Sequence, residues 1–232
     1  MTEHATDMDL LLDGMERLGI VPSSLQQRQF AIYMAEIALF NSTYRLVGAE
    51  GRDFVVKHLL DSLAPLDHIA SLLNSCGPES TLCDVGSGAG LPGIPLAIML
   101  ADTSVFLVER SGRRCGFLRN VVASCNLDSR VAVIQSDLSE VVDTFDVVTF
   151  RAFHPLVDII RPIGNVIADR GYVCAYKGRI ESVEAELLEV GNLVREGKTP
   201  EWTSRTIPLS VPFLDAPRTM VVMQKGGKDE EM

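Results

Sequence analysis

The chain has 232 residues, of which 47% are hydrophobic but only 6% aromatic, and its formal net charge is −10. This length is enough to bury a sizeable core, and no apolar stretch approaches the ~18 residues that cross a bilayer. The segment MTEHATDMDL carries acids where a signal peptide carries basic residues, so we expect a cytoplasmic protein with no membrane partner. The five cysteines form no CxxC pair and are odd in number, which argues against a disulfide framework and against a metal site.

The charge is unevenly distributed along the chain. Residues 105–180 hold 10 basic and 8 acidic side chains, whereas the segments on either side are acidic. Because salt screens charges beyond about 8–10 Å, an acidic protein can still present a basic surface around one site. A nucleic-acid partner is therefore compatible with the composition, although the composition alone does not favour it.

Apolar residues recur with helical spacing over 7–40 and again over 53–74. The sequence PSS at 22–24 divides the first stretch into two helices, with one of its serines as the N-cap of the second helix. Pro65 breaks or kinks the later helix. We predict an N-terminal helical region, residues 1–76, that packs on a second domain.

From residue 77 the pattern changes, because short apolar runs alternate with helical stretches. Strands that alternate with helices predict right-handed crossovers and a parallel sheet covered on both faces. The last two runs are joined by a proline-rich loop without a helix, which predicts one antiparallel strand. We expect an α/β, Rossmann-like domain with a seven-stranded, mostly parallel sheet over 77–225, and a disordered tail at 226–232. The seven runs are TLCDV, SVFLVE, RVAVIQ, FDVVTF, GYVCAYK, WTSRTIPL and TMVVMQK.

A glycine-rich loop follows the first of these strands, in the segment LCDVGSGAGLPGIPLAI (82–98). A P-loop needs GxxxxGK[ST], and no lysine stands in this segment. The run from Gly88 to Gly93 matches the dinucleotide pattern GxGxxG, and Glu109 stands about 20 residues further on, as a ribose-binding acid would. Two features oppose that interpretation. The glycines begin earlier, at Gly86, and Asp84 would place a buried carboxylate beside the pyrophosphate.

A cationic ligand reverses the argument about charge. S-adenosylmethionine carries a sulfonium and an amino group, and no phosphate, so Asp84 attracts it where it would repel a dinucleotide. Glu109, which we expect at an exposed strand end, can accept hydrogen bonds from both ribose hydroxyls. A purely structural alternative is that the glycines make a tight turn and Asp84 caps the next helix. The pattern favours the methyl donor, and with it a class I S-adenosylmethionine-dependent methyltransferase fold.

Five motifs stand in order along the chain: KHLLDSLAPL, GSGAGLPGIPLAI, ERSGRRCGFLRNVV, FRAFHPL and YKG. Together they resemble, over about residues 35–225, the RsmG (GidB) family of bacterial 16S (small-subunit) ribosomal RNA guanine-N7 methyltransferases. The ending PGIPLAI is much more specific than the glycines alone. The chain departs from the family at Arg45, where asparagine is common, at Phe150, where serine usually precedes the arginine, and at Glu109, where aspartate is common.

The resemblance implies which residues contact S-adenosylmethionine. Guanine N7 has a free lone pair and needs no proton removed, so we predict no catalytic acid or base. The alternatives are a methyltransferase that acts on another RNA, a protein or a small molecule, and a methyl-donor-binding regulatory or assembly protein without turnover. The implied donor contacts are Gly86, Leu91, Leu138, Ser139 and Arg151, to which the ribose argument adds Glu109.

Further candidates have two possible roles each. Asp137 follows the third strand, where it could reach the adenine amino group or cap a short helix. Arg151 could instead pair with a helix acid, and His58 and Asp61, three residues apart on a helix, could contact each other or the site. Lys177 could meet an RNA phosphate or be solvated. The same choice holds for the rim arginines, by which we mean Arg110, Arg113, Arg114 and Arg119.

Overall fold

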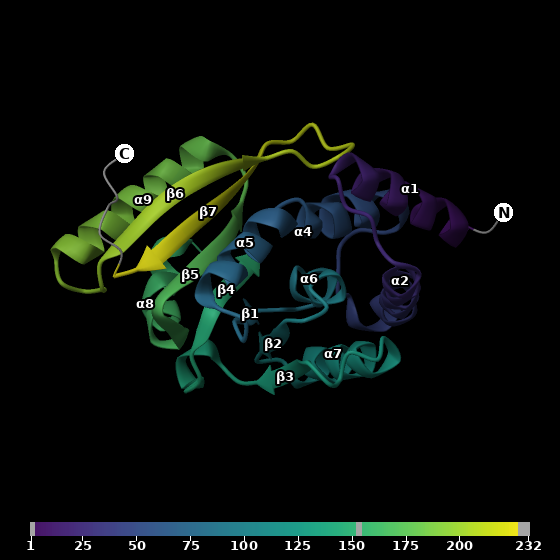
Figure 1. The fold of residues 1–232 in the computed structure, drawn as a ribbon, viewed down its shortest axis with the longest axis horizontal. Helices are drawn as coiled ribbons and strands as arrows, with labels where there is room; N and C mark the ends of the chain where they lie inside the picture. Colours follow the sequence, from purple (N-terminus) through teal and green to yellow (C-terminus); the bar gives the residue numbers. More distant parts are fainter. Residues whose placement is uncertain (1–2, 152–154, 227–232) are drawn as a thin grey trace.

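The N-terminal part of the chain is helical in the computed structural model, which describes residues 3–151 and 155–226. Helix α1 spans Glu3–Arg17 and helix α2 spans Ser24–Tyr44 (Figure 1). The break between them is the predicted one. Ser23 is the N-cap of α2, where its hydroxyl accepts from the Gln26 backbone while the Gln26 side chain accepts from the Ser23 backbone.

The second helical stretch is divided more finely than its spacing predicts. It contains α3 (Gly51–Phe54), a π-helical turn η1 (Val55–Leu60), α4 (Asp61–Leu63) and α5 (Leu66–Cys76). Pro65 separates α4 from α5, which confirms the predicted break. The π turn was not predicted, because its buried residues Val55, Val56, Leu59 and Leu60 have the spacing of an ordinary α-helix.

The described residues form one seven-stranded sheet in the order β3-β2-β1-β4-β5-β7-β6. Strands β1 to β5 run parallel, and β7 lies antiparallel between β5 and β6. This confirms the predicted α/β fold, including the reversed strand at the end of the chain. The strands are β1 (Thr81–Val85), β2 (Ser104–Glu109), β3 (Val131–Gln135), β4 (Phe145–Arg151), β5 (Ile167–Lys177), β6 (Trp202–Leu209) and β7 (Arg218–Lys225).

Helices cover both faces of the sheet (Figure 1). On one face, α6 (Gly93–Met99) and α7 (Gly112–Ser124) share a core with α1, α2 and alternate strand residues such as Leu82. On the other, α8 (Leu156–Val166) and α9 (Ile180–Arg195) pack on strand residues such as Cys83. The N-terminal helices therefore share a core with the sheet, and a domain boundary after residue 76 stays a prediction.

Two further expectations concern the ends of the domain and the membrane. Gly226 ends the described part of the chain in a turn, and the rest of the predicted tail, 227–232, lies outside the described residues. None of the described helices is long and apolar enough to cross a membrane.

Candidate functional site

The loop between β1 and α6 is built on three glycines with left-handed backbone conformations, Gly86 (φ 70°), Gly88 (φ 58°) and Gly90 (φ 91°). L-residues with side chains rarely adopt these angles. The Gly86 N–H donates to the Val108 carbonyl at 2.9 Å, which ties the loop to the end of β2. A Cβ on Gly90 would lie 2.5 Å from the Ile94 side chain, so the loop is also held close to α6.

This loop borders a cleft of about 520 Å³ at the carboxyl ends of β1, β2 and β4, which we call the donor cleft. The other side of the cleft is formed by Leu138–Glu140, a single 3₁₀ turn, and by the start of α8. Leu91 instead packs in the core, 7% exposed, and its predicted contact stays a prediction. Five of the six residues predicted to contact the donor line the cleft: Gly86, Glu109, Leu138, Ser139 and Arg151.

Glu109 is 5% exposed, which corrects the expectation of an exposed strand end. The loop and the start of α7 close over it. Its carboxylate accepts from the Gly88 N–H at 3.0 Å and from the Ser111 N–H at 2.8 Å, with the Arg114 guanidinium 3.8 Å away. Each oxygen keeps a second lone pair. Glu109 can therefore fix the loop and still accept from a ligand in the donor cleft.

Replacing Glu109 with alanine should weaken binding of S-adenosylmethionine by roughly 1–3 kcal/mol, the usual cost of losing a charged hydrogen-bond partner. The protein should still fold, although with reduced stability, since two backbone N–H groups lose their acceptor. Calorimetric titration with the donor, alongside urea unfolding, measures both effects. An unchanged dissociation constant in a folded variant would remove Glu109 from the site.

Asp84 is fully buried at the end of β1. One carboxylate oxygen accepts from the Gly93 N–H at 3.1 Å. Asp84 therefore caps the start of α6, as the structural alternative in the sequence analysis proposed. The other oxygen, Oδ1, has no hydrogen-bond partner among the described residues. Burial raises the pKa of this carboxyl to about 7. An orphaned acidic oxygen beside the glycine loop fits a cationic ligand and opposes a pyrophosphate.

Arg151 joins β4 to the helical region through three contacts. Its Nη1 donates to Asp61 Oδ2 and to the Lys57 carbonyl, both at 3.0 Å, and its Nη2 lies 2.8 Å from His58 Nδ1. Burial and the Arg151 charge lower the pKa of His58 to about 4, so the ring is neutral and Nδ1 accepts. His58 and Asp61 therefore both fix the position of the Arg151 guanidinium.

A second arginine completes this network, and no pattern in the sequence indicates its role. Arg218, at the start of β7, donates from Nε to Asp61 Oδ1 at 2.8 Å. Asp61 is 4% exposed and lies between two guanidinium groups. Asp61 is thus the kind of helix acid with which the sequence analysis expected Arg151 to pair. Arg151 also lines the donor cleft.

The contacts of the remaining candidates bear on their predicted roles. Asp137 caps the 3₁₀ turn by accepting from the Ser139 N–H at 3.1 Å and its hydroxyl at 2.8 Å. It also lines the donor cleft, so its contact with adenine stays a prediction. Lys177 pairs with Glu186 at 2.7 Å and its side chain is 13% exposed, so it is not freely solvated, and its contact with an RNA phosphate stays a prediction. All four rim arginines are exposed, and Arg110 and Arg114 line the cleft itself. The segment 152–154 of the FRAFHPL motif lies outside the described residues.

The strand order, the reversed β7 and the glycine loop after β1 define the class I S-adenosylmethionine-dependent methyltransferase fold. A solved structure with this fold is magnesium protoporphyrin IX methyltransferase from Synechocystis with bound S-adenosylhomocysteine. It is 19% identical, covers 84% of this chain and 99% of its own, and has a TM-score of 0.54.

The family is established by sequence. The family model described as rRNA small subunit methyltransferase G matches residues 26–205. A ribosomal RNA small subunit methyltransferase G from Psychrobacter arcticus is 31% identical over 92% of this chain and 82% of its own length. Another from Xanthomonas euvesicatoria is 36% identical over 84% of each chain. The chain belongs to this family and is an S-adenosylmethionine-dependent methyltransferase, which confirms the resemblance and the cofactor predicted from its motifs.

Proposed function

We propose that this protein transfers a methyl group from S-adenosylmethionine to guanine N7 of 16S ribosomal RNA, acting on the small ribosomal subunit or its precursor in the cytoplasm. The observation that carries the proposal is the family match over residues 26–205, which includes the helical region from α2 onward and the donor cleft. The site residues and the RNA contacts below are part of the same proposal.

The chemistry needs alignment and charge compensation more than proton transfer. The bound donor supplies an electrophilic methyl group on a sulfonium, and the new C–N7 bond forms as the C–S bond breaks. Guanine N7 already carries its lone pair, so no side chain has to remove a proton. Orientation of the two reactants can contribute as much as ~7–11 kcal/mol. Positive charge moves from sulfur to the purine, and no proton leaves.

Within this mechanism the chain's own residues bind and orient. Glu109 accepts from ribose hydroxyls, and Asp84 places negative charge under the cationic end of the donor. Arg151 forms the wall beside the reacting groups, held by Asp61 and His58. The Leu138 and Ser139 backbone borders the adenine end of the cleft.

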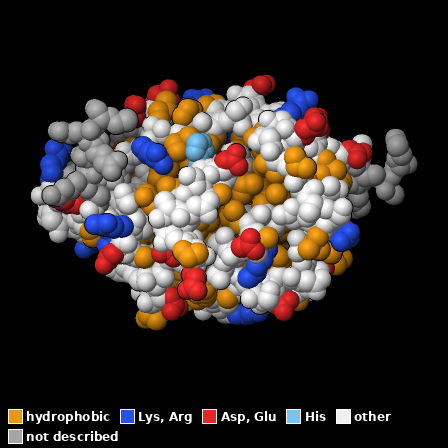
Figure 2. All heavy atoms as spheres, viewed as in Figure 1, with side chains coloured by type: hydrophobic (Ala, Val, Ile, Leu, Met, Phe, Trp, Pro, Cys, Tyr) orange, Lys and Arg blue, Asp and Glu red, His pale blue; other side chains and the backbone are white. Residues whose placement is uncertain are grey.

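RNA binding depends on local groups rather than on the overall charge. Figure 2 shows one face of the molecule, where Lys and Arg side chains are interspersed with Asp and Glu. The rim arginines are a local exception, because Arg110 lies two residues before α7 and three further exposed arginines lie on α7, beside the donor cleft. We propose that they contact phosphates of the RNA.

The proposed reaction is tested by mapping methylated guanines in ribosomal RNA from cells with and without this gene product. We expect one N7-methylguanine to disappear with the gene. Purified protein should restore it on small subunits from the deletion cells when S-adenosylmethionine is present. An unchanged methylation map, with no transfer to these subunits, would refute the proposed substrate.

Replacing Arg113 and Arg119 with alanine should weaken RNA binding and leave donor affinity intact, since neither residue lines the donor cleft. Each lost phosphate contact should reduce the salt slope of RNA binding by about 0.7 if the RNA behaves as a single strand. The slope is measured by titration at several salt concentrations. Arg195→Ala, an exposed arginine on α9, is the matched control. Equal slopes in all three proteins would show that the rim arginines are only solvated.

A further inference from the structure

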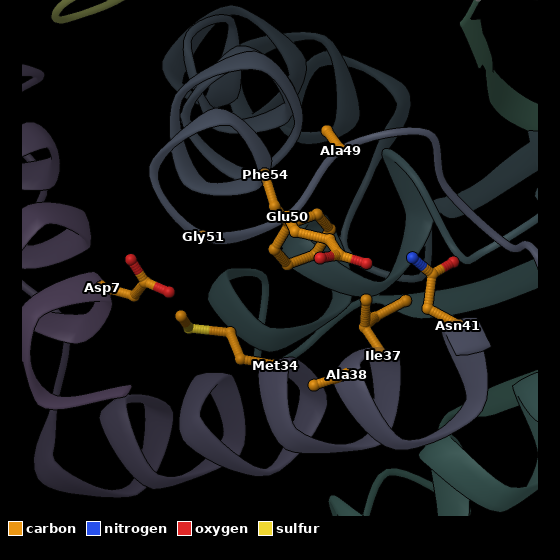
Figure 3. A pocket seen from close by; sticks show the side chains of 9 residues that line it. All are labelled: Asp7, Met34, Ile37, Ala38, Asn41, Ala49, Glu50, Gly51 and Phe54. Atoms are coloured by element: carbon orange, nitrogen blue, oxygen red, sulfur yellow. The ribbon is translucent and has the colours of Figure 1, made fainter. Parts of the chain in front are cut away.

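A second cavity, of about 210 Å³, lies between α1, α2 and α3, apart from the donor cleft (Figure 3). We call it the α1–α3 cavity. One wall is the Phe54 ring, and the apolar side chains of Met34 and Ile37 form part of another. Its polar side chains are Asp7, Asn41 and Glu50. An aromatic wall combined with a few polar groups is typical of a site for a flat, polar ring.

The hydrogen-bonding roles of two of these groups are fixed. Asn41 Oδ1 accepts from the Val47 N–H at 3.0 Å, so the Asn41 amide nitrogen is a donor. The Glu50 carboxylate can only accept, and it forms no hydrogen bond to the helix that it precedes and no ion pair within the described residues. Figure 3 shows the Asn41 nitrogen and the Glu50 carboxylate pointing toward each other, with Asp7 on the far side of the cavity.

This combination of one donor and two acceptor oxygens matches one nucleobase. The Watson–Crick edge of guanine presents O6, N1–H and the N2 amino group side by side, which is one acceptor followed by two donors. Asn41 offers one donor beside the two acceptor oxygens of Glu50. Adenine, cytosine and uracil each place a ring or carbonyl acceptor where a carboxylate would repel it. RNA-binding proteins commonly read unstacked bases in this way, by stacking on an aromatic ring and hydrogen bonds to the base edge.

The cavity lies next to the donor cleft but is separated from it. The Phe54 ring centroid is 5.8 Å from that of His58, and His58 contacts Arg151 in the wall of the cleft. A base in the cavity is therefore on the far side of the Phe54 and His58 rings from the cleft. It is a different base from the one that accepts the methyl group.

Two arginines lie on the surface next to the cavity. A hollow that adjoins the cavity shares Asn41 and Glu50 with it and adds Arg45, Arg52 and Asp53, of which Asp53 pairs with Lys57. Arg45 directly follows Tyr44, and the Arg113 guanidinium lies 5.6 Å from the centre of the Tyr44 ring. Arg45 therefore lies near the rim arginines, whereas the Arg52 guanidinium lies 5.5 Å from the centre of the Phe213 ring. Arg45 is the residue placed to hold a phosphate of a strand that reaches both sites.

We propose that the α1–α3 cavity binds a guanine base of the RNA substrate, other than the guanine that is methylated. The identification of the ligand as RNA rests on the proposed function. The base is held by contact with the part of Phe54 that lines the cavity, by acceptance of N1–H and N2–H by Glu50, and by donation from Asn41 to O6. Recognition of a second guanine adds sequence selectivity that the reacting atom alone does not supply.

The direct test uses guanosine 5′-monophosphate as the probe, with the protein saturated with S-adenosylhomocysteine so that the donor cleft is filled. We expect binding by nuclear magnetic resonance titration, at least tenfold weaker for adenosine 5′-monophosphate. Glu50→Gln should weaken the guanosine complex at least tenfold, because its amide opposes one guanine donor. Ala38→Trp should block the cavity from the exposed side of α2. Glu79→Gln, an exposed acid before β1, should change nothing.

The same variants on small subunits separate this inference from the proposed function. If wild type methylates the subunits, Glu50→Gln should raise KM at least fivefold and leave kcat and donor affinity unchanged. Wild-type KM in both Glu50→Gln and Ala38→Trp, or no binding of the guanosine probe by wild type, overturns the cavity assignment while the methyl transfer stands. Spermidine binding in place of the nucleotide would also overturn it, since the cavity would then serve an organic cation.

Discussion

Replacing Asp61 with alanine is expected to lower the free energy of unfolding by about 3 kcal/mol and to weaken donor binding as well. Asp61 is 4% exposed and holds Arg151 at 3.0 Å and Arg218 at 2.8 Å. Removing one member of a buried ion pair leaves the other charges uncompensated, at a cost of ~3–5 kcal/mol. The lower end applies here, because the side chain of Arg218 is 26% exposed and keeps part of its hydration.

The affinity for the donor shows whether Asp61 positions Arg151 or only stabilises the fold. Without Asp61, Arg151 keeps only His58 and the Lys57 carbonyl as partners, so its place in the cleft wall is less fixed. Urea unfolding and calorimetric titration with S-adenosylmethionine are measured on the same samples. Asp53→Ala, which removes an exposed pair with Lys57, should cost only about 0–1 kcal/mol. A destabilised Asp61→Ala protein with wild-type donor affinity would leave Asp61 a structural role alone.

Much of the fold follows from local chemistry that the sequence displays. Ser23 and Gln26 form a capping box three residues apart, and Pro65 lacks the N–H that would continue the preceding helix. The position of β7 was also predictable. Two apolar runs joined by a loop without a helix favour an antiparallel hairpin. The last strand, β7, therefore runs opposite to β5 and β6.

What the sequence could not predict depends on how distant segments meet. Glu109 was placed at its strand end by spacing, but its burial comes from the loop and α7 closing over it. Arg218 lies 157 residues from Asp61, so no local pattern links them. The α1–α3 cavity exists because three helices leave space between them, and side chains as ordinary as Asn41 and Glu50 have no signature in the sequence.

Asp84 should make both stability and donor binding depend on pH, and Asp84→Asn should remove that dependence. The folded-state pKa of about 7 is above the ordinary value of 3.8, because burial disfavours the charge. The stabilising contribution of the protonated group is therefore fully present below about pH 4 and lost as the pH rises through 7. Relative to wild type, Asp84→Asn should gain up to about 4 kcal/mol between pH 4 and pH 8. Urea unfolding at a series of pH values measures this gain.

Donor binding should respond in the opposite sense. A cationic ligand stabilises ionised Asp84, so the wild-type protein should bind S-adenosylmethionine more tightly as the pH rises through 7 and should release a proton on binding at pH 6. Asp84→Asn should bind more weakly at pH 8 and release less. The donor's own amino group titrates near pH 8 with both proteins, so the difference between them isolates Asp84. His58, with its pKa lowered to about 4, stays neutral across this range. Calorimetry in buffers of different ionisation enthalpy counts the protons released on binding. Equal counts for wild type and Asp84→Asn would mean that Asp84 does not change its protonation when the donor binds.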